Sequence, residues 1–156
     1  MDSPANDQDR IDHPRNQAPQ IGCCLDDRYR LDAELGRGGA GVIYRAYDTL
    51  LQREAAIKVL SAGALSDEGR ARLLREAQAA ARLHHPNIMT VYDVRETVTL
   101  NGEPGAYIVM ELLDCETLRD CASRSVAEIL AGAQQVCAAL EHAHAHGIIH
   151  RDLKPE

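Results

Sequence analysis

The chain has 156 residues, the size of one ordinary domain, and a formal net charge of -7. That charge argues against nucleic acid as the main partner, because phosphate binding needs clustered Lys and Arg. Residues 1–156 contain no signal peptide and no apolar run near the roughly 18 residues of a membrane span. The five cysteines lack zinc-site spacing, which indicates reduced thiols and a cytoplasmic protein. With five Tyr and no Trp or Phe, the core is expected to consist of Ala, Leu, Ile and Val.

The first 28 residues are predicted to be a disordered acidic leader. They are rich in Asp and Pro and show no hydrophobic periodicity. Order is therefore expected to begin near Tyr29.

Residues 29–110 are predicted to combine short strands with one helix. The strand signals lie at 29–35, 42–47, 54–60, 88–94, 96–100 and 106–112. The helix is expected to start after Ser66 as its N-cap and to run to about Leu83. Pro86 disfavours helical backbone at the residue before it and so ends the segment.

After a join at about Glu111–Asp114 the pattern becomes helical. A short helix is predicted at Thr117–Ser123 and a long one at Val126–His146, with Gly147 placed to terminate it. The long helix carries an apolar stripe that residues 1–156 do not cover, so this stripe is expected to be exposed.

A glycine-rich segment, Gly36–Gly41, has the pattern G-x-G-x-x-G, in which glycines let backbone amides approach phosphate oxygens. The dinucleotide-binding version of this pattern needs a helix directly after the loop. Here the β-rich residues 42–46 follow, which favours a strand–loop–strand hairpin folded over phosphates. An ordinary glycine hairpin is the alternative interpretation.

Lys58 lies within the apolar strand signal at 54–60, where a buried unpaired ammonium would be costly. Glu76, 18 residues further on in the predicted helix, is a candidate partner. The pair would hold the ammonium at nucleotide phosphates. The alternatives are a lysine that points outward from an edge strand and a solvated helix glutamate.

Six segments in this order resemble the protein kinase fold, and in particular the bacterial, eukaryotic-like serine/threonine protein kinases. They are Leu35–Ala46, Ala56–Leu60, Arg75–Ala77, His85–Ile88, Tyr107–Glu111 and His150–Glu156. The resemblance implies a kinase domain over residues 29–156 with an α+β fold. It would comprise an N-lobe (29–110) with a five-stranded antiparallel sheet and one helix, a hinge (111–114) and the first C-lobe helices (115–156).

The resemblance also implies an ATP site. Leu35 and Ile43 would sandwich the base, Lys58 would contact the α- and β-phosphates, and Met110 would close the back of the adenine pocket. The implied ATP-binding residues are Leu35, Gly36, Arg37, Gly38, Gly39, Ala40, Gly41, Val42, Ile43, Ala56, Lys58, Glu76, Met110, Glu111 and Leu113. Ala40 departs from the larger residues that the family prefers at the loop tip.

The last seven residues resemble the start of a kinase catalytic loop. Asp152 would accept or orient the proton of a protein Ser or Thr hydroxyl, and Lys154 would steady the γ-phosphate. Arg151 resembles the arginine that pairs with a phosphorylated activation loop.

The implied cofactors are ATP and Mg²⁺, but the family's Mg²⁺ ligands would lie beyond Glu156. The chain is therefore expected to be a portion of a kinase that is inactive alone. The alternative is a stand-alone truncated module that binds nucleotide or a partner kinase without catalysis. A metal site at His142 and His146, which share a helical face, is disfavoured, and no metal ligand is assigned.

Overall fold

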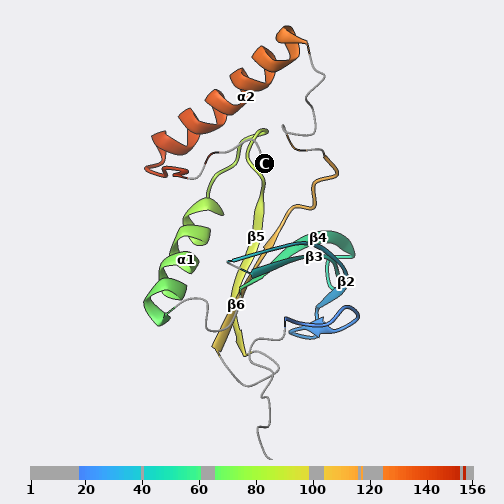
Figure 1. The fold of residues 1–156 in the computed structure, drawn as a ribbon. Helices are drawn as coiled ribbons and strands as arrows, with labels where there is room; N and C mark the ends of the chain where they lie inside the picture. Colours follow the sequence, from blue (N-terminus) through green and yellow to red (C-terminus); the bar gives the residue numbers. More distant parts are fainter. Residues whose placement is uncertain are drawn as a thin grey trace, which may run out of the picture.

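A computed structural model describes residues 18–39, 41–60, 66–98, 104–115, 117, 125–151 and 153. Within them, six strands form a single sheet, with one helix beside it and a second, C-terminal helix beyond its end (Figure 1). The elements are β1 (Cys24–Leu25), β2 (Tyr29–Gly38), β3 (Gly41–Asp48), β4 (Arg53–Leu60), α1 (Asp67–Ala80), β5 (Val91–Val98), β6 (Pro104–Met110) and α2 (Val126–Ala145). The strand order is β1-β2-β3-β4-β6-β5, and every neighbouring pair is antiparallel.

The sheet differs from the six predicted strand signals in two places, and with β1 it has one strand more than the five expected. The two strand signals at 88–94 and 96–100 form one continuous strand, β5, because no turn interrupts the chain at Arg95. A further strand, β1, lies in the predicted leader and pairs with the start of β2.

The main core lies on one face of the sheet, to which alternate strand residues point. Three of the five tyrosines, Tyr29, Tyr44 and Tyr107, are among its fully buried members. The rings of Tyr29 and Tyr107 meet edge to face with centroids 5.9 Å apart. The expectation of a core built only from Ala, Leu, Ile and Val was therefore wrong.

Residues 18–28, which we call the N-terminal strap, are folded against this core. Their expected place was in the disordered leader. The Tyr44 hydroxyl donates a hydrogen bond to the Pro19 carbonyl at 2.8 Å, and the Leu31 amide donates to the Cys23 carbonyl at 2.9 Å. Cys23 and Leu25 pack on the core residues. The structured part of the chain therefore begins earlier than Tyr29.

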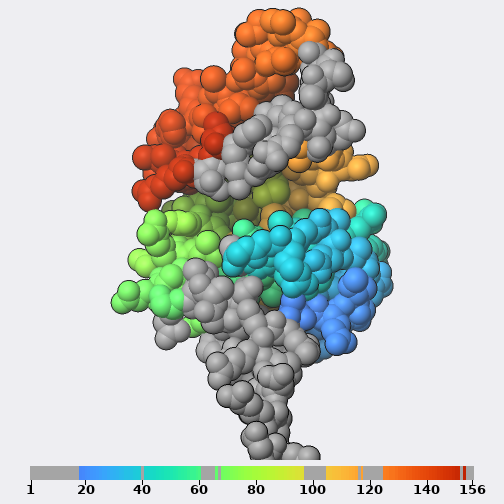
Figure 2. Space-filling model, in the orientation of Figure 1, coloured from blue at the N-terminus to red at the C-terminus, as the bar shows by residue number. Residues whose placement is uncertain are grey.

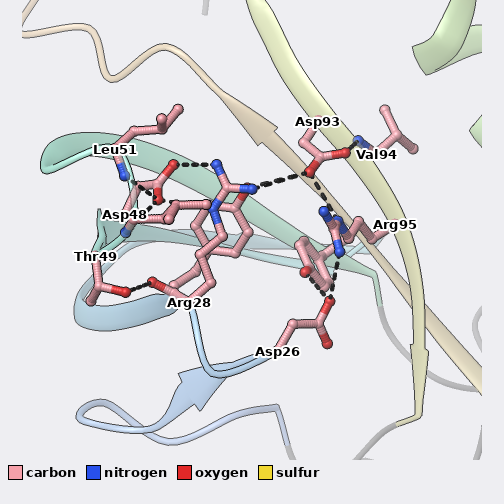
Figure 3. Close-up of polar contacts among 11 residues, drawn as sticks. Asp26, Arg28, Asp48, Thr49, Leu51, Asp93, Val94 and Arg95 are labelled. Atoms are coloured by element: carbon pink, nitrogen blue, oxygen red, sulfur yellow. Dashed lines mark hydrogen bonds and ion pairs between the residues drawn. The ribbon is translucent and has the colours of Figure 1, made fainter.

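A buried carboxylate fixes the strap to the turn between β3 and β4 (Figure 3). The Arg28 guanidinium donates to both oxygens of Asp48, at 2.9 and 2.7 Å. The Leu50 and Leu51 amides each donate to Asp48 Oδ1 at 3.1 Å. These bonds, that from Arg28 foremost, lower the pKa of Asp48 to about 2 although burial opposes the shift.

α1 begins as predicted, because the Ser66 side chain accepts a hydrogen bond from the Gly69 amide at 3.2 Å. Leu74 lies in a second apolar cluster with Leu60 and Ala106, which places α1 against the sheet edge near β5 and β6. The helix ends at Ala80, three residues before the predicted end.

α2 is capped by Ser125 and Glu128, which form a capping box, and its bounds agree with the prediction within one residue. The Asn87 side chain donates to the Gln135 carbonyl at 3.3 Å and joins α2 to the loop after α1. Val126, Ile129 and Leu130 are 74%, 59% and 60% exposed, which confirms the expected exposed stripe. The predicted helix at Thr117–Ser123 lies outside the described residues except for Thr117.

In space-filling view, α2 (orange to red) forms one end of the molecule, and the β2–β3 hairpin (cyan) lies at the surface of the sheet region (Figure 2). No helix among the described residues is long and apolar enough to cross a membrane.

Candidate functional site

The glycine-rich loop connects β2 to β3, and Gly38 pairs directly with Gly41 at its base. This strand–loop–strand arrangement differs from the strand–loop–helix of a dinucleotide-binding turn. Ala40 lies outside the described residues.

Gly41 is the glycine that the backbone most strictly requires. Its φ is +144°, and a Cβ built on it would lie 2.1 Å from the Val59 carbonyl oxygen. At Gly36, Gly38 and Gly39 a Cβ would meet nothing within 4 Å. The loop therefore approaches the β4 backbone at Gly41 more closely than any side chain allows.

Lys58 lies at the centre of a row of residues that crosses three strands. Ile43 on β3 and Ile108 on β6 are its direct partners. Two residues away, Ala56 pairs with Arg45 and with Met110. Directly opposed residues share one face of a sheet, so these residues line the face opposite the tyrosine core.

The side chains on this face differ in how far they are exposed to solvent. Ala56 and Met110 are buried, at 6% and 7% exposure, whereas Ile43 and Lys58 are half-buried. Val42, an expected ATP-binding residue, lies in the tyrosine core on the opposite face.

The structure does not join Lys58 to Glu76. Among the described residues no ion pair links the two, and the Glu76 carboxylate instead accepts a hydrogen bond from Arg72 Nε at 3.0 Å. Both Arg72 and Glu76 are more than half exposed on α1. The Arg72–Glu76 pair is therefore a surface ion pair of the weak i,i+4 kind.

Arg37, within the glycine loop, is held by a residue that the sequence did not single out. Its Nε and Nη2 donate to the two carboxylate oxygens of Glu34, at 3.1 and 2.7 Å. Between them the pairing of β2 with β3 shifts by one residue, so Leu35 forms a β-bulge and is half exposed at 52%. A spacing of three does not suggest contact in a regular strand, so only the bulge reveals this pair.

The segment after β6 begins with two hydrogen bonds between Thr90 and Glu111, which we call the double clamp. The Glu111 amide donates to the Thr90 carbonyl at 2.9 Å, and the Thr90 amide donates to the Glu111 carboxylate at 3.3 Å. Leu113, two residues on, is 50% exposed. The clamp holds Glu111 at the start of β5, whereas Leu113 is free of the core.

A cavity of about 680 Å³ lies between this segment and α2, with Glu111, Cys115 and Gln135 in its lining. Lys58 and the glycine loop are not in its wall. The cavity is therefore distinct from the face on which Lys58 lies.

The proposed catalytic loop is described only in part. His150 and Arg151 are exposed, and Arg151 has a positive φ of +61°. Asp152 and Lys154 lie outside the described residues.

Three histidines meet where α2 faces the loop after α1. The ring centroids of His85 and His142 are 5.2 Å apart, and those of His142 and His146 are 4.5 Å apart. Partial burial and the neighbouring imidazoles lower the pKa of His142. In the described part of the chain, no group of three or more His, Cys, Asp or Glu could hold a metal ion.

Comparison with known proteins agrees with this geometry. Residues 29–156 match the protein kinase domain family. The chain is 48% identical over 139 residues to the serine/threonine-protein kinase PknB of Mycolicibacterium smegmatis, covering 84% of this chain and 22% of that protein. It is 43% identical over 143 residues to the probable serine/threonine-protein kinase PknB of Lactococcus lactis, covering 88% and 22%.

A solved structure gives the same result for the fold. The kinase domain of PknI from Mycobacterium tuberculosis superposes with a TM-score of 0.73 at 33% identity, covering 88% of this chain and 55% of that one. The chain spans about a fifth of the length of the curated relatives cited above, 22% in both cases. A six-stranded antiparallel sheet, in which the glycine hairpin pairs with the strand that carries Lys58, together with these matches, shows that the chain belongs to the protein kinase domain family.

Proposed function

We propose that this chain carries the nucleotide-binding part of a serine/threonine protein kinase, which transfers the γ-phosphoryl group of ATP to a Ser or Thr hydroxyl of a protein. The observation that carries the proposal is the row Ile43–Lys58–Ile108 beside the pair Ala56–Met110. It combines one ammonium group with an apolar surface on a single face of the sheet.

The residues of this face fit the two ends of ATP. Ala56, Ile43 and Met110 offer apolar surface for the adenine ring, with Leu35 at the rim. Lys58 would contact the phosphates, and the loop amides of Gly36–Gly41 would cover them. The backbone of Glu111 and of Leu113 would bind the edge of the base.

The proposal places the phosphoryl-transfer step on residues near the end of the sequence, by their resemblance to the start of a kinase catalytic loop. Asp152 would orient the substrate hydroxyl and take its proton, and Lys154 would steady the γ-phosphate. Protein kinases use Mg²⁺ to neutralise charge on the phosphates. The described residues contain no ligand set for such an ion.

The position of Glu76 bears on catalysis. Protein kinases act with their strand lysine paired to the helix glutamate, whereas here Glu76 is paired with Arg72. Breaking the Arg72–Glu76 pair costs little, because an exposed i,i+4 pair contributes only about 0.3–0.5 kcal/mol.

Titration of ATP into the purified chain, with Lys58→Met as the variant, tests the proposal. Charge-assisted hydrogen bonds to the phosphates are lost, so the variant should bind ATP roughly 10- to 100-fold more weakly. Arg75→Met, which removes one positive charge from an exposed position of α1, is the control and should bind within about twofold of wild type. Equal ATP affinity of Lys58→Met and wild type would contradict the proposed site.

Binding and transfer are separated by a second measurement. Labelled phosphate in a protein substrate that appears with the wild-type sequence and disappears with Lys58→Met would establish transfer. ATP binding without any transfer agrees both with a kinase portion that is inactive alone and with a binding module, so it does not decide between them.

A further inference from the structure

We propose that Glu34 is a positioning residue for the glycine loop: its ion pair with Arg37 locks the β-bulge at Leu35 and thereby fixes the loop over the phosphates of ATP. The effect on ATP rests on the proposed function. The effect on the loop itself does not.

The bulge determines which face each loop residue occupies. Glu34 pairs with Tyr44, Gly36 with Ile43 and Arg37 with Val42. In a regular strand, residues three apart point to opposite faces. Because Leu35 is the extra residue, Glu34 and Arg37 both lie on the face of Tyr44 and Val42, whereas Gly36 lies opposite Ile43 on the face of Lys58.

The contact between Glu34 and Arg37 has the geometry of a strong planar pair. Two parallel hydrogen bonds, of 3.1 and 2.7 Å, join the guanidinium to the carboxylate. The pair raises the pKa of Arg37 and lowers that of Glu34. Their side chains are 37% and 57% exposed, so a modest contribution is expected.

A one-residue change of register shows what the pair prevents. If the bulge were lost, every following residue of β2 would exchange faces. The Arg37 side chain would then move to the face of Lys58, and Gly36 would turn away from it. The Glu34–Arg37 ion pair can form only when Leu35 is the extra, bulged residue. It therefore stabilises the observed register over the register without a bulge.

Hydrogen exchange of the loop amides tests the inference without any nucleotide. In Glu34→Gln and in Arg37→Gln, the amides of residues 36–41 should exchange about two- to fivefold faster than in wild type, in keeping with an exposed pair. Reversal of the pair, Glu34→Arg with Arg37→Glu, should restore slow exchange. Arg72→Gln breaks the Arg72–Glu76 pair on α1, which is also exposed, and should leave the loop amides unchanged.

ATP and adenosine binding provide the functional readout. The single variants should weaken ATP by about two- to fivefold and adenosine by less, because adenosine has no phosphates for the loop to cover. If the reversed pair restores ATP affinity, the ion pair acts by positioning the loop, and Arg37 does not act by contacting phosphate directly.

Three results would overturn the inference. One is loop exchange in both single variants that equals that of wild type. Another is a reversed pair that exchanges as fast as the single variants. The third is exchange that rises equally at Val59 and Val109, since that would reveal general unfolding of the sheet. If the wild-type chain binds no ATP, the proposed function fails while the exchange result still decides the role of Glu34.

Discussion

Replacement of Gly41 by Ala should destabilise the sheet more than the equivalent change at any neighbouring loop glycine. The new Cβ would lie 2.1 Å from the Val59 carbonyl oxygen and 3.0 Å from the Leu60 Cα, both of which are backbone atoms that no rotamer change can move. The φ of +144° adds backbone strain for any residue with a side chain.

The expected magnitude follows from these two terms. A positive φ of this kind costs about 1–3 kcal/mol. Forcing apart packed backbone costs about 1–3 kcal/mol as well. Together they predict a loss of roughly 2–6 kcal/mol in the free energy of unfolding, and a fall in Tm of roughly 10 °C.

Urea and thermal unfolding, followed by circular dichroism, measure this loss. Gly38→Ala is the matched control, because a Cβ at Gly38 meets nothing within 4 Å. Its free energy of unfolding should stay within about 1 kcal/mol of wild type. If Gly41→Ala unfolds within about 0.5 kcal/mol of wild type, the close approach of the loop to β4 does not exist in solution.

Two further predictions concern the strap and α2. The pKa of Asp48 is lowered from 3.8 to about 2 in the folded protein, so its contribution of about 2 kcal/mol is present above pH 4 and lost as the pH falls to 2. In wild type, the free energy of unfolding should fall by this amount between pH 4 and pH 2. An Asp48→Asn variant that showed the same fall would contradict the role of the bond between Arg28 and Asp48. Ile129 and Leu130 are exposed, so Gln at both should change stability by less than about 0.5 kcal/mol each and reduce self-association in light scattering. A loss of several kcal/mol there would mean that the stripe is packed in solution.

Features encoded within a few residues could be predicted from the sequence. Ser66 acts as the N-cap of α1, as predicted, because capping depends on neighbours three residues away. The start of α2 at Val126 was likewise predicted. The predicted strand–loop–strand arrangement around Gly36–Gly41 is confirmed. It could be predicted because the residues after the loop favour β-structure.

Features that depend on contacts distant in sequence could not be predicted. Nothing local distinguishes the strap from a disordered leader, because its order comes from partners such as Asp48 and Tyr44. The pairing of Glu76 with Arg72 in place of Lys58 depends on where α1 lies against the sheet. The bulge at Leu35 likewise results from the register between two strands, which sequence periodicity does not specify.

The double clamp between Thr90 and Glu111 has a mechanical consequence. It ties the end of β6 to the start of β5, so Met110 and Glu111 belong to the rigid body of the sheet. Leu112 is half-buried and Leu113 exposed, so burial against the sheet falls off directly after the clamp. Any movement of α2 relative to the sheet should therefore leave the surface around Met110 unchanged in shape, because Met110 and Glu111 move with the sheet.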